Sequence, residues 1–450
     1  MIRTLKNNRK VIKNIFLFVI IFSIVFCITF FATECYLDEI WNYGFSYNIA
    51  NGLVPYRDFN MLQTPLLFYL GSLFINVFGH HLWSVNILNS LIITTIICVM
   101  YKEIGNKVYI LFPFIFMFSV SCYSYNLFCL LLVIIILFLI DKKSKNKDIL
   151  IALLVSFVFL SKQNIGVCLF IPMLFYSKNK IKSFIVFMIP ILMFVVYFML
   201  NGAFYNFIDY CFLGMLDFGE SNSNYRFLIF ELLILVVLIY ALKKSKFKDE
   251  KAFYVLMFQI VAFPICDAYH CLLGLILVLY YIFLQTNLYK LKSKYCFTFF
   301  IVGLVLFIFS GNVFKDYYLY DDSNSYLYGR VFDKNNQLVI NEVGNYILDN
   351  VDDYGDNIFI FSTRAYLIKL NINVKINKYD LLLNGNMGYN GDERIIKEVN
   401  DICGDEKCLF IIDPSEFDIN NQLNKNIINY VEDEYEKAGN LYSFFIYNND

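Results

Sequence analysis

Residues 149–176 read ILIALLVSFVFLSKQNIGVCLFIPMLFY, two apolar blocks of 12 residues around the tetrapeptide Ser161-Lys162-Gln163-Asn164. Twelve residues make about 18 Å of α-helix, whereas the hydrocarbon core of a bilayer is about 30 Å thick. Lysines stand before the first block, at 142–147, and after the second, at 178–182. Loops rich in lysine usually face the cytoplasm, so we expect both of these ends on the cytoplasmic side. We therefore expect the chain to enter the membrane, turn at the tetrapeptide and return, so that the turn lies at membrane depth.

Two further stretches have the same form. Residues 108–140 break at a polar turn over 121–126, and residues 252–284 break at 264–270. Polar backbone and charge persist at membrane depth only where protein buries them or where they line a hydrated cavity. We therefore expect a wet cavity that opens toward the outer leaflet and has polar side chains in its lining: Asp58, Tyr123, Asn126, Asn164, Asp267 and His270. A second reading stays open, in which these turns are interfacial loops in a thinned bilayer and Lys162 snorkels to the interface.

The composition of the whole chain agrees with a membrane protein. Of the 450 residues, 59% are hydrophobic and 17% are charged, against about 25% charged in a typical soluble domain. This excludes a disordered chain and an ordinary soluble enzyme, and a net charge of −1 gives no indication of a nucleic-acid partner. About eleven apolar segments can be delimited: 15–31, 81–101, 108–119, 125–140, 149–160, 165–176, 184–200, 227–242, 252–264, 271–284 and 296–310.

Charge divides the chain into two parts. Residues 1–314 carry 25 Lys and Arg against 14 Asp and Glu, whereas residues 315–450 carry 12 against 24 and lack a long apolar run. In the first part, 22 of the 25 basic residues lie before the first span or in alternate loops, which predicts that these loops face the cytoplasm. We expect a multi-pass protein of the cell membrane with a cytoplasmic N-terminus. The loop 34–80 and the acidic domain 315–450 would then be extracytoplasmic.

The loop 34–80 contains a predicted interfacial helix. Asp38 opens a stretch with apolar and aromatic residues at helical spacing, which ends at Asn51-Gly52. A second short helix is expected after Thr64-Pro65, because proline suits the first turn of a helix. Asp38 and Glu39 would lie at a helix N-terminus near the outer face, where simple helix capping is an alternative role. A local ion pair in a turn is the alternative for Arg57 and Asp58.

These features resemble the GT-C glycosyltransferases, a superfamily that includes the protein O-mannosyltransferases and the lipid A aminoarabinose transferase. The resemblance is carried by Asp38-Glu39 after the first span, the interfacial helix, and Gly-x-x-Pro-Tyr-Arg-Asp-Phe over residues 52–59 with a following Pro-Leu. Lys162-Gln163 and Asp267-x-x-His270 also look like segments of bacterial members. The resemblance implies a polyprenyl-phosphate-linked sugar as donor and an acidic residue of the first outer loop as the group that carries the chemistry, a position that Asp38 matches. The acceptor is not implied.

The chemistry of such a transfer needs one carboxylate, because a phosphate leaves as a stable anion and requires no proton, unlike the leaving group in glycoside hydrolysis. We expect Asp38 to be the general base of an inverting transfer, with Glu39 as the second candidate or an orienting residue. The donor phosphate would be held by Arg57, Lys162 and Gln163, in surroundings of low dielectric. No cofactor is expected. No metal is expected either, because Asp267 and His270 are too few ligands for one.

Other functions compete with this one. A transporter or flippase for lipid-linked saccharides would also collect charge in a cavity, but the two related halves common among transporters are not seen. A polysaccharide polymerase or ligase would be expected to have a large outer loop between its late spans, and this sequence has no such loop there. A sensor with a ligand-binding acidic domain would not explain Asp38-Glu39 beside a wet cavity.

In the acidic tail, segments whose apolar residues have helical spacing alternate with short apolar segments typical of strands. This order predicts a small α/β layer domain. Helices are expected over 336–350, 364–370, 393–402 and 425–438, and strands over 357–361, 409–413 and 441–447. The glycine-rich segment 384–391 is interpreted as a turn. Cys403 and Cys408 are the close pair in this domain, and outside the cytoplasm a disulfide between them is plausible.

Overall fold

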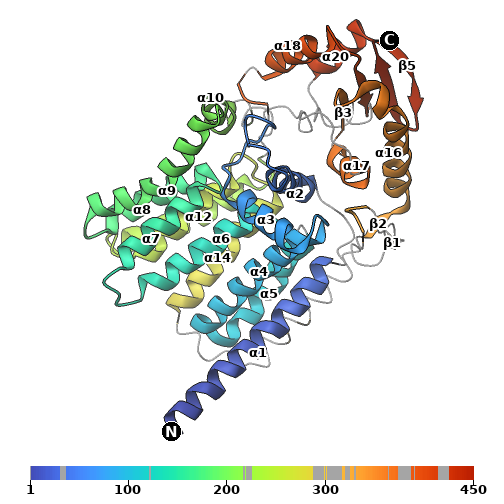
Figure 1. Cartoon of the computed structure of the whole chain (residues 1–450). Coiled ribbons are helices and arrows are strands. Elements are labelled where there is room, and N and C mark those ends of the chain that lie inside the picture. Colours follow the sequence, from blue (N-terminus) through green and yellow to red (C-terminus); the bar gives the residue numbers. More distant parts are fainter. Residues whose placement is uncertain are drawn as a thin grey trace.

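The structure is a computed structural model that describes residues 2–30, 37–120, 123–215, 218, 225–286, 298, 301, 317–319, 325–328, 331–362, 364–372, 387–389, 391–413 and 425–449. Its first part is a helical body (Figure 1), in which three short irregular helical segments (Gly105–Lys107, Asp209–Leu213 and Gln259–Ala262) accompany the α-helices. The α-helices of this body are α1 (Ile2–Phe30), α2 (Leu37–Ala50), α3 (Leu66–Phe78), α4 (Trp83–Ile104), α5 (Val108–Val120), α6 (Tyr125–Ile140), α7 (Lys147–Phe159), α8 (Gln163–Tyr176), α9 (Lys180–Leu200), α10 (Phe204–Ile208), α12 (Leu228–Lys244), α13 (Glu250–Phe258) and α14 (Ala268–Gln285).

Several helices of this body have the length and surface of membrane helices. By length and composition, three described stretches could cross a bilayer: Trp83–Ile115, Lys180–Leu200 and Ala268–Gln285. Large apolar side chains on α9 and α12 are exposed, as on helices that face lipid. Helices α7 and α8 have 13 and 14 residues and are too short to span, as their sequence predicts. The eleventh predicted segment, 296–310, lies almost wholly outside the described residues.

The two predicted helices of the first outer loop are confirmed. Helix α2 spans 14 residues, has Asp38 and Glu39 in its first turn and ends at Ala50, directly before Asn51-Gly52. Gly52 has a φ of +83°, a conformation that glycine adopts at low cost where a helix stops. Helix α3 begins at Leu66, after Pro65. The two helices pack against each other, so the first outer loop is a folded unit.

The C-terminal part forms an α/β layer, as predicted. Its sheet has the order β3-β4-β6-β5, in which β3 pairs with β4 in parallel and the other pairs are antiparallel. Side chains alternate between its two faces: Ile358 and Ile360 pack with α16 and α17, whereas Phe359 and Phe361 pack with α18 and α20. The elements are β3 (Ile358–Phe361), β4 (Leu409–Ile412), β5 (Glu436–Leu441), β6 (Phe444–Asn448), α16 (Lys334–Tyr354), α17 (Ala365–Ile372), α18 (Gly391–Cys403) and α20 (Lys425–Glu434). A separate antiparallel pair joins β1 (Tyr317–Leu319) to β2 (Val331–Asp333).

One prediction in this domain is wrong. The helix expected over 425–438 ends at Glu434, and residues 436–441 form the edge strand β5. Most side chains of β5 are exposed and the strand contains Gly439, so it lacks the apolar alternation that marks a strand in a sequence. Its pairing with β6 across the turn at Tyr442 defines it instead.

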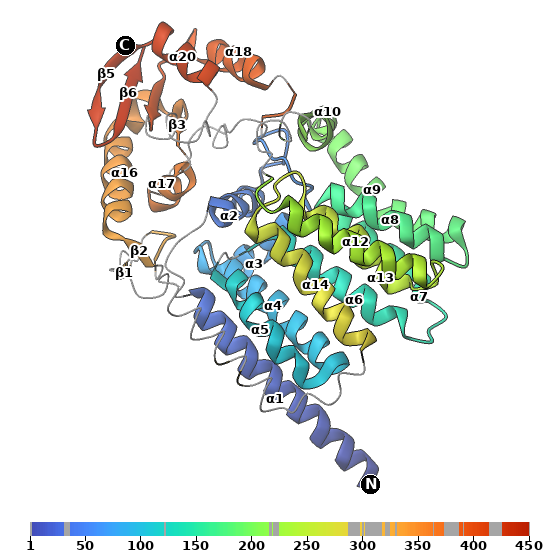
Figure 2. The same ribbon diagram turned by 180° about the vertical axis from the view of Figure 1, so that it is seen from behind.

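The C-terminal domain docks on the outer loop through α17. The Tyr366 ring meets the edge of the Phe45 ring with centroids 6.2 Å apart, and Asn48 donates a hydrogen bond to the Tyr366 hydroxyl over 3.2 Å. Gly44 makes this contact possible, because a Cβ at this position would lie 2.3 Å from the Tyr366 ring. Figures 1 and 2 show α17 beside α2, with the N-terminus of α1 at the opposite end of the molecule.

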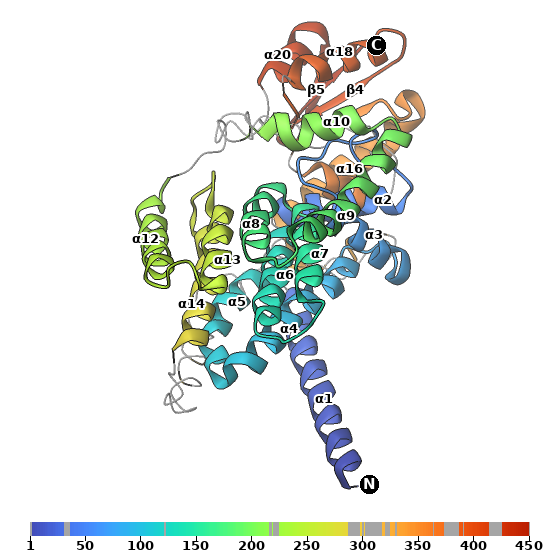
Figure 3. The same ribbon diagram turned by 90° about the vertical axis from the view of Figure 1, so that its left-hand side faces the viewer.

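A second contact joins α18 to the helical body. Arg394 donates to Asp209 over 2.8 Å and to the carbonyl of Met387 over 2.7 Å, and the backbone N–H of Tyr389 donates to Asp209 over 3.1 Å. Asp209 directly follows α10, which lies below the C-terminal domain in Figure 3. The domain is therefore fixed to the helical body at two separated points.

The Gly44–Tyr366 contact yields a stability prediction. We expect Gly44→Ala to lower the melting temperature of the detergent-solubilised protein, because overpacking costs about 1–3 kcal/mol. In a Tyr366→Ala background the same methyl group has room, so Gly44→Ala should then cost much less. Thermal unfolding of the four proteins in this double-mutant cycle measures the difference, and equal costs in both backgrounds would contradict the contact.

Candidate functional site

Asp38 lies in the first turn of α2 and has unusual surroundings. Its side chain is reached by solvent, yet burial among protein atoms raises the pKa of its carboxyl above the ordinary value. The carboxyl is thus open to solvent although protein atoms crowd around it. Electrostatic interactions with His270 and Lys162 lower this pKa, and the negative charge of Asp267 raises it. These three residues therefore lie close enough to act on Asp38.

Lys162 occupies the turn between α7 and α8. It is the residue before α8 and has an extended backbone. Its Nζ donates a hydrogen bond to Asn126 Oδ1 over 2.9 Å and lies 5.4 Å from the centre of the Tyr125 ring. Both partners belong to the first turn of α6, which follows the second polar turn. The ammonium group is thus held by protein groups.

The third turn is joined to the second. Asp267 caps α14 by accepting a hydrogen bond from the backbone N–H of His270 over 2.9 Å, and the same Oδ1 lies 2.9 Å from His270 Nδ1. The hydroxyl of Tyr269 forms a 2.9 Å hydrogen bond with Ser124 Oγ, at the N-cap of α6. Burial opposes ionisation of Asp267, but these bonds from His270 outweigh it and hold its pKa below the usual range.

The structure therefore brings the three turns and the start of α2 to one place. We call Asp38, Lys162, Asp267 and His270 the acid–base cluster. Its members come from four segments that are distant in the sequence, and each retains some contact with solvent. This arrangement can hold an anion beside a carboxylate that exchanges protons.

Arg57 and Asp58 are not part of this cluster. Arg57 lies in the turn after α2, with 46% of its side chain exposed, and makes a two-pronged ion pair with Asp58 at 2.8 and 2.9 Å. Asp58 also accepts a hydrogen bond from the backbone N–H of Val54 over 2.7 Å. Neither charge is among those that act on Asp38. The structure thus favours the local turn role that was the alternative for this pair.

Two further candidates prove to be structural. Tyr123 does not line a cavity, because it is fully buried and its hydroxyl bonds to Ser46 Oγ over 2.7 Å and to the carbonyl of Leu67 over 2.9 Å. Gln163 is also buried, and its amide donates to the carbonyls of Leu62 and Cys211 over 3.2 and 2.7 Å. Both side chains turn inward and brace the outer loop, whereas the sequence suggested that they face a ligand.

The remaining candidates surround the cluster. Glu39 is fully buried, one residue from Asp38. Asn126 is fully buried too, so it positions Lys162 and does not line the recess. Asn164 is partly exposed and accepts a hydrogen bond from the backbone N–H of Ile165 over 2.9 Å. Sequence reasoning missed the roles of Tyr125 and Tyr269, although both stand in the predicted polar turns.

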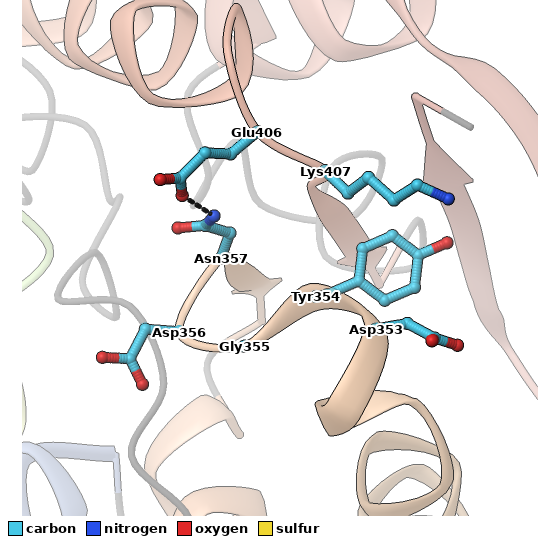
Figure 4. A pocket seen from close by; sticks show the side chains of 7 residues that line it. All are labelled: Asp353, Tyr354, Gly355, Asp356, Asn357, Glu406 and Lys407. Atoms are coloured by element: carbon cyan, nitrogen blue, oxygen red, sulfur yellow. Dashed lines mark hydrogen bonds between the residues drawn. The ribbon is translucent and has the colours of Figure 1, made fainter.

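Within the described residues, no group of three or more His, Cys, Asp or Glu side chains has the geometry to hold a metal ion. A separate open pocket of about 480 Å³ lies on the C-terminal domain (Figure 4). It lies between the end of α16 and the turn after α18, and its polar lining includes Asp353, Asp356, Glu406 and Lys407. None of these residues belongs to the acid–base cluster. A disulfide joins Cys403 to Cys408 beside this pocket.

A helical body with a folded loop after its first helix, short hairpins and a small C-terminal α/β domain is a fold that solved structures share. The particular structures that it matches are those of ArnT from Cupriavidus metallidurans. ArnT bound to undecaprenyl phosphate superposes with a TM-score of 0.58 at 9% sequence identity, and apo ArnT with 0.55 at 8%. In both cases 97% of this chain and 98% of ArnT are covered. At this identity the likeness shows the fold.

No protein-family model matches the sequence, and no curated protein matches it. The fold that the chain shares with ArnT agrees with the family resemblance noted in the sequence. The polytopic helical architecture and the integral membrane character follow from that fold together with the apolar helices.

The electrostatics of the acid–base cluster can be tested without a substrate. We expect Asp38 to titrate above about 3.9, the ordinary value for aspartate. Removing a positive neighbour disfavours the carboxylate, so Lys162→Gln should move the midpoint to higher pH, whereas Asp267→Asn should move it to lower pH. Infrared difference titration against Asp38→Asn isolates the signal. A midpoint that neither variant moves would contradict the cluster.

Proposed function

We propose that the protein is a membrane glycosyltransferase that moves a sugar from a polyprenyl-phosphate-linked donor to an acceptor hydroxyl at the outer face of the membrane, with inversion. The observation that carries this proposal is the position of Asp38, a solvent-reached carboxylate on which the charge of Lys162 acts. The shared fold with ArnT, whose structure holds undecaprenyl phosphate, supports a lipid phosphate as partner.

Asp38 acts as the general base. The acceptor oxygen attacks the anomeric carbon from the face opposite the phosphate, the bond from that carbon to the phosphate oxygen breaks, and Asp38 takes the proton of the acceptor hydroxyl. The phosphate carries the bonding electrons away as an anion and needs no acid. Burial raises the pKa of Asp38, which makes it a stronger base than an exposed aspartate.

Lys162 binds the donor phosphate. An ammonium group has three N–H donors, and the bond to Asn126 uses one of them. Charge that develops on a phosphate is stabilised more strongly in a recess than in water. A bound phosphate also offsets the positive charge that lowers the pKa of Asp38, so donor binding makes the base stronger. Gln163 and Arg57 are left out of this role because their side chains are engaged elsewhere.

The orientation completes the proposal. Residues 1–314 form the membrane domain and residues 315–450 the extracytoplasmic domain, in a protein of the cell membrane with a cytoplasmic N-terminus. Support comes from the basic loops and from the opposite positions of the N-terminus and the C-terminal domain in Figure 2. The docking of α17 on α2 would place the outer domain next to the helix that carries Asp38.

The base is tested by Asp38→Asn. Loss of a general base lowers the rate on the order of 10²–10⁴-fold, and we expect that loss in transfer from radiolabelled polyprenyl-phosphate sugars. A carboxyl with a raised pKa stabilises the folded state at low pH and loses that contribution as pH rises through the folded pKa. Asp38→Asn should therefore keep or raise the melting temperature at neutral pH, which separates lost chemistry from lost folding.

Glu39→Gln is the matched variant for this test, because it changes the neighbouring carboxylate, which is buried. We expect it to retain far more transfer than Asp38→Asn. Wild-type turnover by Asp38→Asn would exclude Asp38 as the base. Loss of transfer in Glu39→Gln alone would assign the role to Glu39.

The phosphate site is tested by Lys162→Met. A hydrogen bond to a charged group contributes about 1.5–3 kcal/mol, so we expect undecaprenyl phosphate to bind roughly tenfold to a hundredfold more weakly. Arg57→Ala is the matched control, since it also removes one cation of the outer side but one that is paired with Asp58. The affinity of the Arg57→Ala variant for undecaprenyl phosphate should stay near that of the wild type. Binding of labelled lipid to the purified proteins measures both, and equal losses would contradict the assignment.

A further inference from the structure

Two thiols bracket the turn that carries Asp267 and His270. Cys266 directly precedes Asp267, and Cys271 directly follows His270. Their sulfur atoms lie 3.6 Å apart, and both side chains are buried. Since a disulfide has a sulfur–sulfur distance of about 2.05 Å, the two sulfur atoms must approach by about 1.5 Å for the bond to form.

The same spacing is closed elsewhere in the chain. Cys403 and Cys408 also stand five residues apart and are joined by a disulfide with a Cα–Cα separation of 5.6 Å. That pair lies at the C-terminal end of α18, whereas Cys266 and Cys271 lie at the N-terminal end of α14. A loop of this length at a helix end is therefore compatible with a disulfide in this protein.

A buried carboxylate accompanies the dithiol. Glu231 is fully buried in the first turn of α12, and the thiol of Cys271 lies within hydrogen-bonding reach of its carboxylate. The thiols of Cys266 and Cys271 are both within electrostatic reach of it. The start of α12 is also tied to this turn, because the backbone N–H of Phe227 donates to the carbonyl of Cys266 over 3.1 Å.

This carboxylate has a chemical use beside a dithiol. A buried ionisable group is costly to keep, so it is by default a candidate functional site. Thiol–disulfide exchange requires a thiolate, and a carboxylate next to the thiol can take its proton. The proposed transfer reaction does not use Glu231, Cys266 or Cys271.

We propose that Cys266 and Cys271 form a reversible disulfide, with Glu231 as the proton acceptor, and that this bond holds the Asp267–His270 turn against Asp38. The oxidant is a disulfide, either of low molecular weight or of a thiol oxidoreductase. Cys271 gives its proton to Glu231 and attacks one sulfur of the oxidant, and the departing sulfur takes that proton from Glu231 and leaves as the first thiol. Cys266 then gives its proton to Glu231 and attacks the sulfur of Cys271 in the mixed disulfide, and the second departing sulfur takes this proton and leaves as the second thiol. One disulfide is reduced to two thiols for each bond formed.

The bond would constrain the cluster directly. The closed loop contains Asp267 and His270, and the charges of both act on Asp38. Cross-linking a loop removes conformational freedom from it, so the oxidised form should hold these charges in a narrower range of positions. The effect on transfer rests on the proposed function, but formation of the bond does not.

Formation is tested on the full-length protein in detergent. The protein is equilibrated with oxidised and reduced glutathione, alkylated, digested and mapped by mass spectrometry. We expect a peptide cross-linked between Cys266 and Cys271 in the oxidising sample. Alkylation of both thiols in that sample, or glutathione adducts that do not resolve into the cross-link, would overturn the proposal.

Glu231→Gln tests the proton acceptor. We expect the same cross-link to form at least tenfold more slowly, while the bond between Cys403 and Cys408 in the same sample re-forms at the wild-type rate after reduction. An unchanged rate at Cys266 and Cys271 would overturn the role of Glu231. The second bond thus serves as an internal control for folding and for the oxidant.

The restraint is tested by hydrogen exchange over residues 264–271, which does not depend on activity. Exchange should slow several-fold on oxidation in the wild type and not in the Cys266→Ser/Cys271→Ser variant. Transfer should fall several-fold on reduction in the wild type alone. A cross-link that changes neither exchange nor transfer would overturn the restraint, whereas slowed exchange in a protein without transfer would count only against the proposed function.

Discussion

An ammonium group inside a body of apolar helices needs polar partners from protein or water, and this requirement shapes the turn that carries it. Helices α7 and α8 are too short to cross a bilayer, so the turn between them carries Lys162 into the fold. There the ammonium group finds Asn126 and the face of Tyr125, both supplied by a second hairpin. A third hairpin joins through the bond between Ser124 and Tyr269. The three turns thus satisfy one another, and the shortness of α7 and α8 is what brings Lys162 to them.

The outer loop holds this arrangement rigid. Thr64 donates to the carbonyl of Phe159 over 2.7 Å, and the backbone N–H of Leu66 donates to the carbonyl of Leu160 over 2.8 Å. Gln163 adds its bond to the carbonyl of Leu62 from the other side. The segment that follows α2 is therefore fastened to the turn that carries Lys162. Because α2 itself carries Asp38, the carboxylate and the ammonium group are set in one framework rather than on two independent loops.

Periodicity and charge were enough to predict the elements, but side-chain direction required the fold. Helix α2 and the short hairpins follow from apolar spacing and block length, and the cluster of Asp38, Lys162, Asp267 and His270 follows from their shared side of the membrane. Tyr123 shows what could not be predicted. Its φ of 54° lies in the left-handed region, which turns the ring away from the recess toward Ser46. No local pattern announces that backbone conformation for a tyrosine.

Helix α2 links the outer domain to the acid–base cluster. Asp38 occupies its first turn, and Phe45 and Asn48 contact Tyr366 of α17 about two and three turns further on. The contact at Gly44 leaves no space for even a methyl group, so α17 cannot slide along α2 without separating from it. A displacement of the outer domain must then either break this contact or move α2 with it. Since α2 is a continuous helix, the second course moves Asp38, and the outer domain thereby shares control of the position of the carboxylate.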